Sequence, residues 1–332
     1  MIARTRTTTR LAALLVALGL ALLGCGSDAE PATEPDTTEP RGADDTAPNG
    51  PPPPALSGQP YTTPASPSQV LDLWLPETTS TDEAVPLVVF IHGGGWVEGD
   101  RSQAASKVPT LLDRGYAVAS LDYRLADEAV FPAAVQDAKA AVRWLRAHAS
   151  EHGIDPDAIA VWGESAGGHL AAMVGVTGDQ ATIFDDPSLG EPDTSSAVQA
   201  VVDWFGPVDL LQMQQQELDH GVCDDPYDHD ADDSYESKWL GESLQQDVDV
   251  AELADPIRWL PTAGALPPFS IAHGDRDCTV DIGQSLLLVT ALELDGQHPQ
   301  VITLSGAGHM DRRFDAEVLS PTIDWLDQVL GR

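Results

Sequence analysis

A serine flanked by two glycines is the first feature of the sequence that could do chemistry. The run Gly163-Glu164-Ser165-Ala166-Gly167 has the spacing of a sharp turn from a strand to a helix, where larger side chains two positions from the serine would collide. An apolar run at 158–162 precedes it and an Ala-rich segment follows it. Such a helix directs its N-terminal dipole and free N–H groups at negative charge that develops beside the serine. The pattern predicts that Ser165 is a nucleophile.

A glycine-rich loop is the second such feature. The run His92-Gly93-Gly94-Gly95-Trp96 directly follows the apolar run 87–91. Consecutive glycines let backbone N–H groups approach a substrate without interference from a Cβ atom. With the N–H of Ala166 they would form an oxyanion hole. A phosphate site is the alternative, but no lysine follows the loop, and Glu98 and Asp100 would repel a phosphate.

An acidic segment and a histidine complete the set. The segment 273–280, which contains Asp275 and Asp277, follows the apolar run 269–272, and His309 follows the run 300–304. Serine, then acid, then histidine is the chain order found in α/β-hydrolases. In such a set the histidine takes the serine proton and later returns it, while a buried carboxylate fixes the histidine tautomer.

Alternating strand and helix patterns must position these residues. Strands are expected at 70–75, 87–91, 116–121, 158–162, 198–205, 269–272 and 300–304, and helices at 133–148, 165–176, 282–294 and 321–330. The alternation predicts the α/β class, with a mostly parallel central sheet and helices on both faces. Residues 207–265 show no strand pattern and are expected to form an insertion over the carboxyl edge of the sheet, as a substrate cap or as a decorated surface loop.

Taken together, the motifs resemble those of the hormone-sensitive-lipase-like carboxylesterases, and most closely the small bacterial esterases related to feruloyl esterases. The resemblance covers nearly all of residues 67–332. Further matching runs are Asp122-Tyr123-Arg124, Phe131-Pro132-Ala133, Gly167-Gly168-His169-Leu170 and Glu236-Ser237-Lys238-Trp239-Leu240-Gly241. The resemblance implies an α/β-hydrolase fold and hydrolysis of esters through an acyl-serine intermediate, without a metal or another cofactor.

The same resemblance assigns the roles of the site residues. Ser165 is expected to be the nucleophile, His309 the base, and Asp277 rather than Asp275 the orienting acid. The oxyanion donors are expected to be the backbone N–H groups of Gly94, Gly95 and Ala166. Glu164 stands where lipase-like members mostly carry aspartate, and we expect no mechanistic consequence of that difference.

The expected substrates are short-chain acyl or aryl esters, and acetyl or feruloyl esters on carbohydrate are candidates by family analogy alone. An exopeptidase of the same fold and a non-catalytic surface-binding module are the alternatives. The intact serine, acid, histidine and loop glycines argue against the binding module, which has no need of all four.

Several other residues attract functional interpretations that the sequence does not favour. We expect His92 and His273 to bond the backbone of their own loops, and His169 to be packed within the helix after Ser165. Trp96 could line an acyl pocket or belong to the core. The acidic run 224–233 lacks the ordered spacing of a calcium loop and is expected to be solvated.

The first residues of the sequence predict export and anchoring. Three arginines precede a short apolar run at 11–23, and Leu22-Leu23-Gly24-Cys25 resembles a bacterial lipobox. We therefore expect residues 1–24 to be a lipoprotein signal peptide and Cys25 to carry lipid, which would anchor the protein to the membrane on the extracytoplasmic side of the cell envelope. The alternative is an ordinary cleaved signal with an incidental cysteine. Residues 25–66, rich in Pro, Asp and Glu, are expected to be a disordered tether, and residues 67–332 the hydrolase domain.

Charge and cysteine content narrow the partners further. The formal net charge of −36 would repel nucleic acid and anionic lipid headgroups. With Cys25 lipidated, Cys223 and Cys278 remain as an even pair in an oxidising compartment, and we expect a disulfide between them, the alternative being two unpaired buried thiols.

Overall fold

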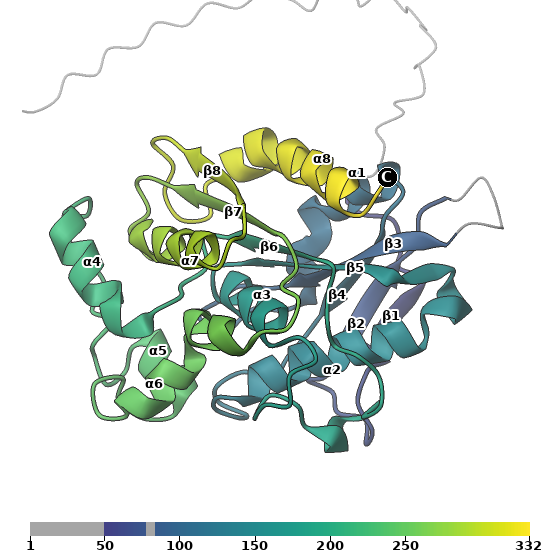
Figure 1. Cartoon of the computed structure of the whole chain (residues 1–332), viewed down its shortest axis with the longest axis horizontal. Helices are drawn as coiled ribbons and strands as arrows, with labels where there is room; N and C mark the ends of the chain where they lie inside the picture. Colours follow the sequence, from purple (N-terminus) through teal and green to yellow (C-terminus); the bar gives the residue numbers. More distant parts are fainter. Residues whose placement is uncertain (1–49, 78–83) are drawn as a thin grey trace, which may run out of the picture. The chain divides into compact units, whose positions relative to one another are not determined.

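The computed structural model describes residues 50–77 and 84–332, and the statements below refer to these residues (Figure 1). The predicted signal peptide, the predicted lipidation site Cys25 and most of the predicted tether lie outside them.

One eight-stranded sheet organises the protein. Its strands lie in the order β1-β2-β4-β3-β5-β6-β7-β8. Their bounds are β1 Leu56–Pro60, β2 Val70–Trp74, β3 Val85–Ile91, β4 Ala117–Leu121, β5 Ile154–Glu164, β6 Ala200–Trp204, β7 Phe269–Gly274 and β8 Gln300–Leu304. The pairs β1–β2 and β2–β4 are antiparallel, and the pairs from β4 through β8 are parallel. The predicted fold class, a mostly parallel α/β sheet, is confirmed.

The register of the parallel strands brings the chemical motifs to one edge of the sheet. Ile91 pairs with Gly163, Glu164 with Trp204, and Gly274 with Leu304. Because these residues end their strands or, for Gly163, precede the last residue, the glycine-rich loop, Ser165 and the loops after β7 and β8 all begin at the same edge. This is where open α/β sheets bind ligands.

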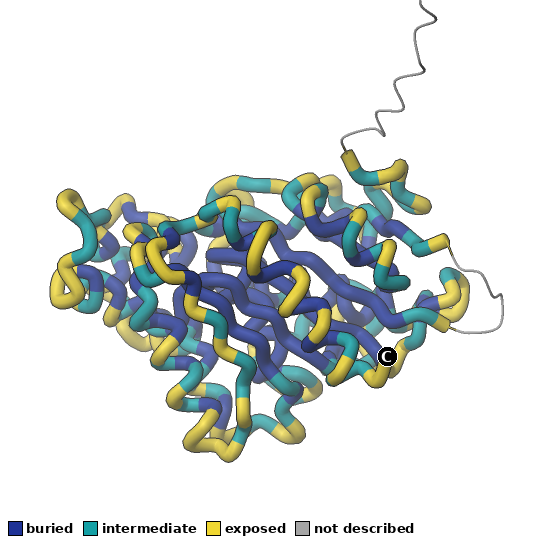
Figure 2. The backbone as a smooth tube through the Cα atoms, turned by 90° about the horizontal axis from the view of Figure 1, so that it is seen from above, coloured by how far each residue is buried: buried dark blue, intermediate teal, exposed yellow. Residues whose placement is uncertain are grey.

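Helices cover both faces of the sheet. One core lies between the sheet and α2 (Ala133–Ala147), α3 (Ala166–Thr177) and α7 (Gly283–Leu294), and the other lies between the sheet and α1 (Val108–Asp113) and α8 (Leu319–Val329). Alternate residues of β3 enter the two cores, with Leu87, Val89 and Ile91 in the first and Val88 and Phe90 in the second. This two-sided burial, dark blue in Figure 2, explains why the run 87–91 is apolar throughout.

The interval between β6 and β7 holds the predicted insertion, residues 207–265. The described structure has no strand there. Its helices are α4 Met213–His220, α5 Tyr235–Leu240 and α6 Val248–Ala254, with the 3-10 segments η4 Leu210–Gln212 and η5 Pro256–Thr262. Trp239 of α5 is fully buried and stacks on Trp96 of the glycine-rich loop, with ring centroids 4.4 Å apart. The insertion is therefore packed onto the loop after β3.

The predicted start of the folded domain at residue 67 is wrong. β1 lies in the predicted tether and pairs with β2, and Trp74 donates a hydrogen bond from Nε1 to the Pro52 carbonyl over 2.8 Å. Tyr61 is buried and donates from its hydroxyl to the Asp122 carbonyl over 2.7 Å. β1 escapes detection because the sequence Leu-Ser-Gly-Gln-Pro carries almost no apolar signal. An edge strand held by backbone hydrogen bonds needs none, and it tolerates proline.

No helix in the described part of the chain is long and apolar enough to span a bilayer.

Candidate active site

The turn at Ser165 joins β5 to α3 in the strained geometry that the sequence predicts. Ser165 has φ 55° and ψ −125°, a positive φ that costs a non-glycine residue about 1–3 kcal/mol. A methyl group at Gly163 would lie 1.9 Å from the Gly167 carbonyl oxygen, and one at Gly167 would lie 2.1 Å from the Ile91 carbonyl oxygen. Both positions are therefore restricted to glycine by direct collision, and the turn presents the serine at the carboxyl edge of the sheet.

The structure brings Ser165, His309 and Asp277 into one hydrogen-bonded chain. Nε2 of His309 lies 2.9 Å from the Ser165 hydroxyl oxygen, and Nδ1 lies 2.7 Å from Oδ2 of Asp277. Asp277 and Ser165 are buried, and the His309 side chain is 13 % exposed. With Nδ1–H donating to the carboxylate, Nε2 is left to accept the serine proton.

Asp277 is held as an ionised acceptor. Its Oδ1 accepts hydrogen bonds from the backbone N–H groups of Thr279 and Val280 over 2.8 and 3.0 Å. Burial acts to raise the pKa of Asp277, but hydrogen bonds from His273 and His309 outweigh it and hold the pKa well below its usual range. The carboxylate therefore stays charged across the physiological pH range.

His273 does more than bond its own loop. Its Nε2 lies 2.8 Å from the Val280 carbonyl, which can only accept, so this nitrogen carries the hydrogen. The same nitrogen is 3.3 Å from Oδ2 of Asp277. Its Nδ1 is then the acceptor for the Ser285 hydroxyl, 2.7 Å away. The expected backbone bond of His273 is therefore confirmed, and the same nitrogen also supports the carboxylate of Asp277, a contact that was not predicted.

Asp275 takes a different position from Asp277. Its carboxylate accepts from the Gly306 N–H over 2.5 Å and from the Ser305 hydroxyl over 3.0 Å. It joins the loop after β7 to the loop after β8, and His309 bonds Asp277 instead.

The three residues expected to supply oxyanion donors border the cavity at Ser165. Gly94, Gly95 and Ala166 line the same cavity as Ser165. Gly94 and Gly95 have φ values of 116° and 56°, and a methyl group at Gly94 would lie 2.1 Å from the Glu98 carbonyl oxygen. Among the described residues, the N–H groups of these three positions donate no hydrogen bond. They are free to bind an oxyanion.

The cavity beside Ser165 has a volume of about 160 Å³ and a largely apolar lining. Trp96, Val280 and Met310 come from the loops at the sheet edge, and Met213 and Tyr235 come from the insertion. The insertion thus forms one wall of the cavity, which favours the substrate-cap interpretation over a surface loop. Trp96 both lines the cavity and is packed in the core. Sequence reasoning missed Met213 and Tyr235, since nothing in the irregular interval marks which residues face the serine.

A buried histidine in the insertion also lines the cavity and was not predicted. His229 lies between two buried glutamates, with Nδ1 3.0 Å from Glu236 and Nε2 3.1 Å from Glu217. Burial acts to lower the pKa of His229, but the two carboxylates outweigh it and raise the pKa above its ordinary value. The neighbouring aspartates 224, 225, 228, 232 and 233 are exposed as expected. Because the run 224–233 is so rich in aspartate, we expected all of it to be solvated, and the burial of His229 was not predicted.

A disulfide joins Cys223 of the insertion to Cys278. Cys278 directly follows Asp277, so this bond attaches the insertion to the loop that carries Asp277. The pairing is the one expected from the sequence.

The other two histidines occupy the positions expected of them. His92 bonds the carbonyl of Gly93 through Nδ1 over 2.8 Å. His169 is fully buried in α3, its Nε2 lies 2.7 Å from the Ala254 carbonyl, and burial lowers its pKa to about 4. In the described structure neither imidazole ring is hydrogen-bonded to Ser165 or His309.

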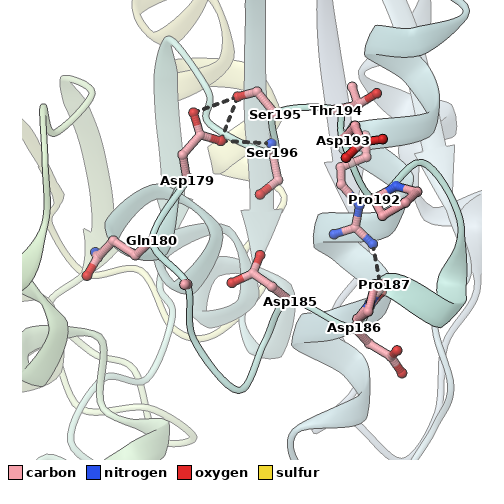
Figure 3. A pocket seen from close by; sticks show the side chains of 12 residues that line it. Asp179, Gln180, Asp185, Asp186, Pro187, Pro192, Asp193, Thr194, Ser195 and Ser196 are labelled. Carbon is pink, nitrogen blue, oxygen red and sulfur yellow. Dashed lines mark hydrogen bonds between the residues drawn. The ribbon is translucent and has the colours of Figure 1, made fainter.

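A larger cavity, of about 380 Å³, lies away from these residues (Figure 3). It is lined by polar loops after α3, where Asp179 accepts hydrogen bonds from the Ser195 hydroxyl and the Ser196 N–H. None of Ser165, Asp277 and His309 lines it.

The sheet, the strained serine turn and the chain order of serine, acid and histidine define an α/β-hydrolase. Within this class the chain belongs to the BD-FAE family, whose sequence profile matches residues 71–292.

Three similar proteins show how far the likeness extends. Esterase LipC of Mycobacterium tuberculosis is 33% identical over 77% of this chain and 60% of its own length. A truncated carbohydrate esterase from gut microbiota has a TM-score of 0.75 and 31% identity, over 85% of this chain and all of that one. Esterase 2 of Thermogutta terrifontis, phosphonylated by sarin, has a TM-score of 0.63 and 26% identity, over 78% of this chain and 89% of that one. The chain spans about half to three fifths of the length of the curated relatives it matches.

Proposed function

We propose that this protein is a serine carboxylesterase that hydrolyses short-chain esters. The observation that carries the proposal is the hydrogen-bonded chain from Ser165 through His309 to Asp277. Its Ser165 end lies at a cavity bordered by three free backbone N–H groups. The esterase names of the relatives support the same chemistry.

The geometry supports a two-step acyl transfer. His309 takes the Ser165 proton at Nε2 while the serine oxygen attacks the ester carbonyl. The negative charge then falls on the carbonyl oxygen, where Gly94, Gly95 and Ala166 offer N–H donors; each such donor is typically worth about 10²–10³ in rate. His309 returns its proton to the departing alcohol, which leaves an acyl-serine. A water molecule, deprotonated by His309, then attacks the acyl carbon, and His309 returns this proton to the Ser165 oxygen as the ester bond breaks and the acid leaves.

The size of the cavity supports short acyl groups. A volume of about 160 Å³ falls below the range of about 300–1,000 Å³ typical of pockets for larger ligands. An acetyl or butyryl group fits such a space, and a decanoyl group would require movement of the wall formed by Met213 and Tyr235. The carbohydrate esterase among the structural relatives makes carbohydrate-linked acetyl esters the first natural substrates to test, followed by feruloyl esters.

An exopeptidase of the same fold is the second candidate. Glu98 and Glu236 line the cavity, and a carboxylate there would attract a substrate amine. Aminoacyl p-nitroanilides separate the two candidates, because an exopeptidase would hydrolyse them and an esterase with this cavity would not.

The test of the proposed function is turnover of p-nitrophenyl acetate, butyrate and decanoate by the purified protein and by Ser165→Ala. We expect acetate and butyrate to be hydrolysed, decanoate to be hydrolysed poorly, and all turnover to be lost in the variant. Equal turnover by the variant would reject the serine mechanism, and a preference for decanoate would reject the short-chain assignment.

The anchoring at Cys25 also remains a proposal. We expect the protein to partition into the membrane fraction of the producing bacterium and Cys25→Ser to release it. Membrane association unchanged by this substitution would reject the lipid anchor.

A further inference from the structure

Two helices of the insertion, α4 and α5 in Figure 1, supply one wall of the cavity beside Ser165. Met213 is the first residue of α4 and Tyr235 is the first residue of α5, and both line the cavity. The segment 221–234 connects the two helices and contains neither a helix nor a strand. The separation of Met213 and Tyr235 therefore depends on the contacts that hold α4 against α5.

Burial of apolar side chains contributes little to holding α4 in place. Of its eight residues only Met213 and Glu217 are buried, and they lie one turn apart on the same face of the helix. Because Met213 is the one buried apolar side chain of α4, the position of this face depends on the contacts of Glu217.

Two polar contacts connect α4 to the start of α7. Gln284 of α7 donates from Nε2 to Oε1 of Gln216 over 2.7 Å. Nδ1 of His220 lies 2.7 Å from Oδ2 of Asp281, which precedes α7. These contacts hold α4 toward the sheet edge and leave its distance from α5 to other residues.

His229 links the two helices directly. Its Nε2 lies 3.1 Å from Oε2 of Glu217 in α4, and its Nδ1 lies 3.0 Å from Oε1 of Glu236 in α5. All three side chains are buried. Because both ring nitrogens face carboxylates, the ring carries both hydrogens and donates in both directions. The backbone N–H of His229 also donates to Oε1 of Gln214 in α4 over 2.7 Å. A planar imidazole between two carboxylates thus sets the spacing of α4 and α5.

The segment that carries His229 is itself held at two other points. The Tyr227 ring stacks on the Tyr235 ring with centroids 5.4 Å apart, and the Tyr235 N–H donates to the Tyr227 hydroxyl over 3.1 Å. The Tyr227 ring also meets the His229 ring at 5.0 Å. The disulfide between Cys223 and Cys278 attaches the beginning of the segment to the loop after β7. The imidazole is therefore fixed relative to Tyr235 and to the loops at the sheet edge.

We propose that His229 is a positioning residue that sets the length of acyl chain the cavity accepts. It holds α4 against α5, which fixes the positions of Met213 and Tyr235. The inference rests on the proposed esterase function and names what determines its chain-length selectivity. His229 itself lines the cavity, whereas Glu217 does not. Substitutions of Glu217 therefore test the positioning without changing a residue that meets the substrate.

Glu217→Ala and Glu217→Gln form the matched pair of variants. Alanine removes the acceptor that faces Nε2 of His229, whereas glutamine keeps an oxygen in its place. The measurement is the ratio of kcat/KM for p-nitrophenyl decanoate to kcat/KM for the butyrate, with the purified protein. One methylene group in an apolar pocket is worth about 10- to 200-fold in kcat/KM, so we expect the ratio to rise at least about tenfold in Glu217→Ala and to stay within about twofold of the parent in Glu217→Gln.

Met213→Ala and Asp137→Asn provide the reference values. Met213→Ala shortens the wall directly and should raise the same ratio. Asp137 is fully buried and accepts hydrogen bonds from Gln69 and Arg124, each over 2.6 Å. Asp137→Asn should lower the melting temperature and leave the ratio unchanged, because a loss of stability away from the wall does not alter chain-length selectivity.

His229→Gln takes the place of Glu217→Ala if that variant does not fold, since a glutamine amide cannot bridge both carboxylates; the same rise is expected. An unchanged ratio in the folded variant, or an equal rise in Asp137→Asn, would overturn the inference. A parent protein without Ser165-dependent turnover would reject the proposed function and the inference with it. An active parent protein whose ratio does not move when the link is broken would reject the inference alone.

Discussion

Replacing Asp277 with asparagine tests the assignment of the acid through the tautomer of His309. In the parent protein Oδ1 of Asp277 accepts from the N–H groups of Thr279 and Val280, and Oδ2 faces Nδ1 of His309 at 2.7 Å. An asparagine would keep its amide oxygen on the two N–H donors. Its NH₂ group would then face Nδ1, which must become an acceptor.

This change at Nδ1 alters the hydrogen bond between His309 and Ser165. With Nδ1 unprotonated, the hydrogen of neutral His309 moves to Nε2, which lies 2.9 Å from the Ser165 hydroxyl oxygen. The imidazole can then no longer accept the serine proton. A tautomer change of this kind costs about 10⁴ in kcat, or about 5 kcal/mol of transition-state stabilisation. The fold should persist, because the substitution is isosteric and the loop N–H groups stay bonded.

The assay is kcat for p-nitrophenyl acetate, with the melting temperature as a check on folding. Asp275→Asn is the matched control, since Asp275 is two residues away and bonds Gly306 and Ser305. We expect it to retain at least about a tenth of the parent activity. A larger loss in Asp275→Asn than in Asp277→Asn, with both proteins folded, would refute the assignment of the acid and the tautomer argument with it.

Three further predictions concern the parts of the fold around the site. Reducing the Cys223–Cys278 bond, which closes a loop of sequence separation 55, should lower the free energy of unfolding by up to about 4 kcal/mol and weaken activity by loosening the loop of Asp277; unchanged melting after labelling of both thiols would contradict this. His229 has a pKa raised above its ordinary value of 6.5, so its ion pairs stabilise the fold fully below pH 6.5, and that contribution is lost as the pH rises through the raised pKa. Urea unfolding at about pH 6 and pH 9 should show this loss in the parent protein and less of it in His229→Gln, and equal losses would reject it. A protein that begins at residue 67 lacks β1 and should melt well below one that begins at residue 50, whereas equal melting would restore the original domain boundary.

The sequence predicted those parts of the fold whose side chains carry a strong periodic signal. The run 87–91 contributes side chains to both cores and is apolar throughout. The other central strands are also rich in apolar residues, so the sequence predicted them equally well. β1 lacks that signal because its hydrogen bonds come from the backbone. α1 was also missed, since six residues with a proline in the first turn are too few to show helical periodicity.

The candidate site likewise contains residues that the sequence predicted and residues that it did not. Ser165, His309 and the loop glycines each follow a predicted strand, so the strand order and their spacing indicate that they meet. The partners of His229 lie 12 residues before it and 7 after it in an irregular segment, and only the tertiary fold brings them together.

The most direct test of the central claim is covalent labelling of Ser165. The purified protein would be treated with an organophosphate, digested and analysed by peptide mass spectrometry, beside measurements of p-nitrophenyl acetate turnover by the parent protein and by Ser165→Ala. We predict one phosphoryl group on the peptide that contains Ser165, loss of turnover in proportion to labelling, and a fall in kcat of at least about 10⁴-fold in the variant. Labelling at another residue, or turnover that persists in Ser165→Ala, would contradict the account.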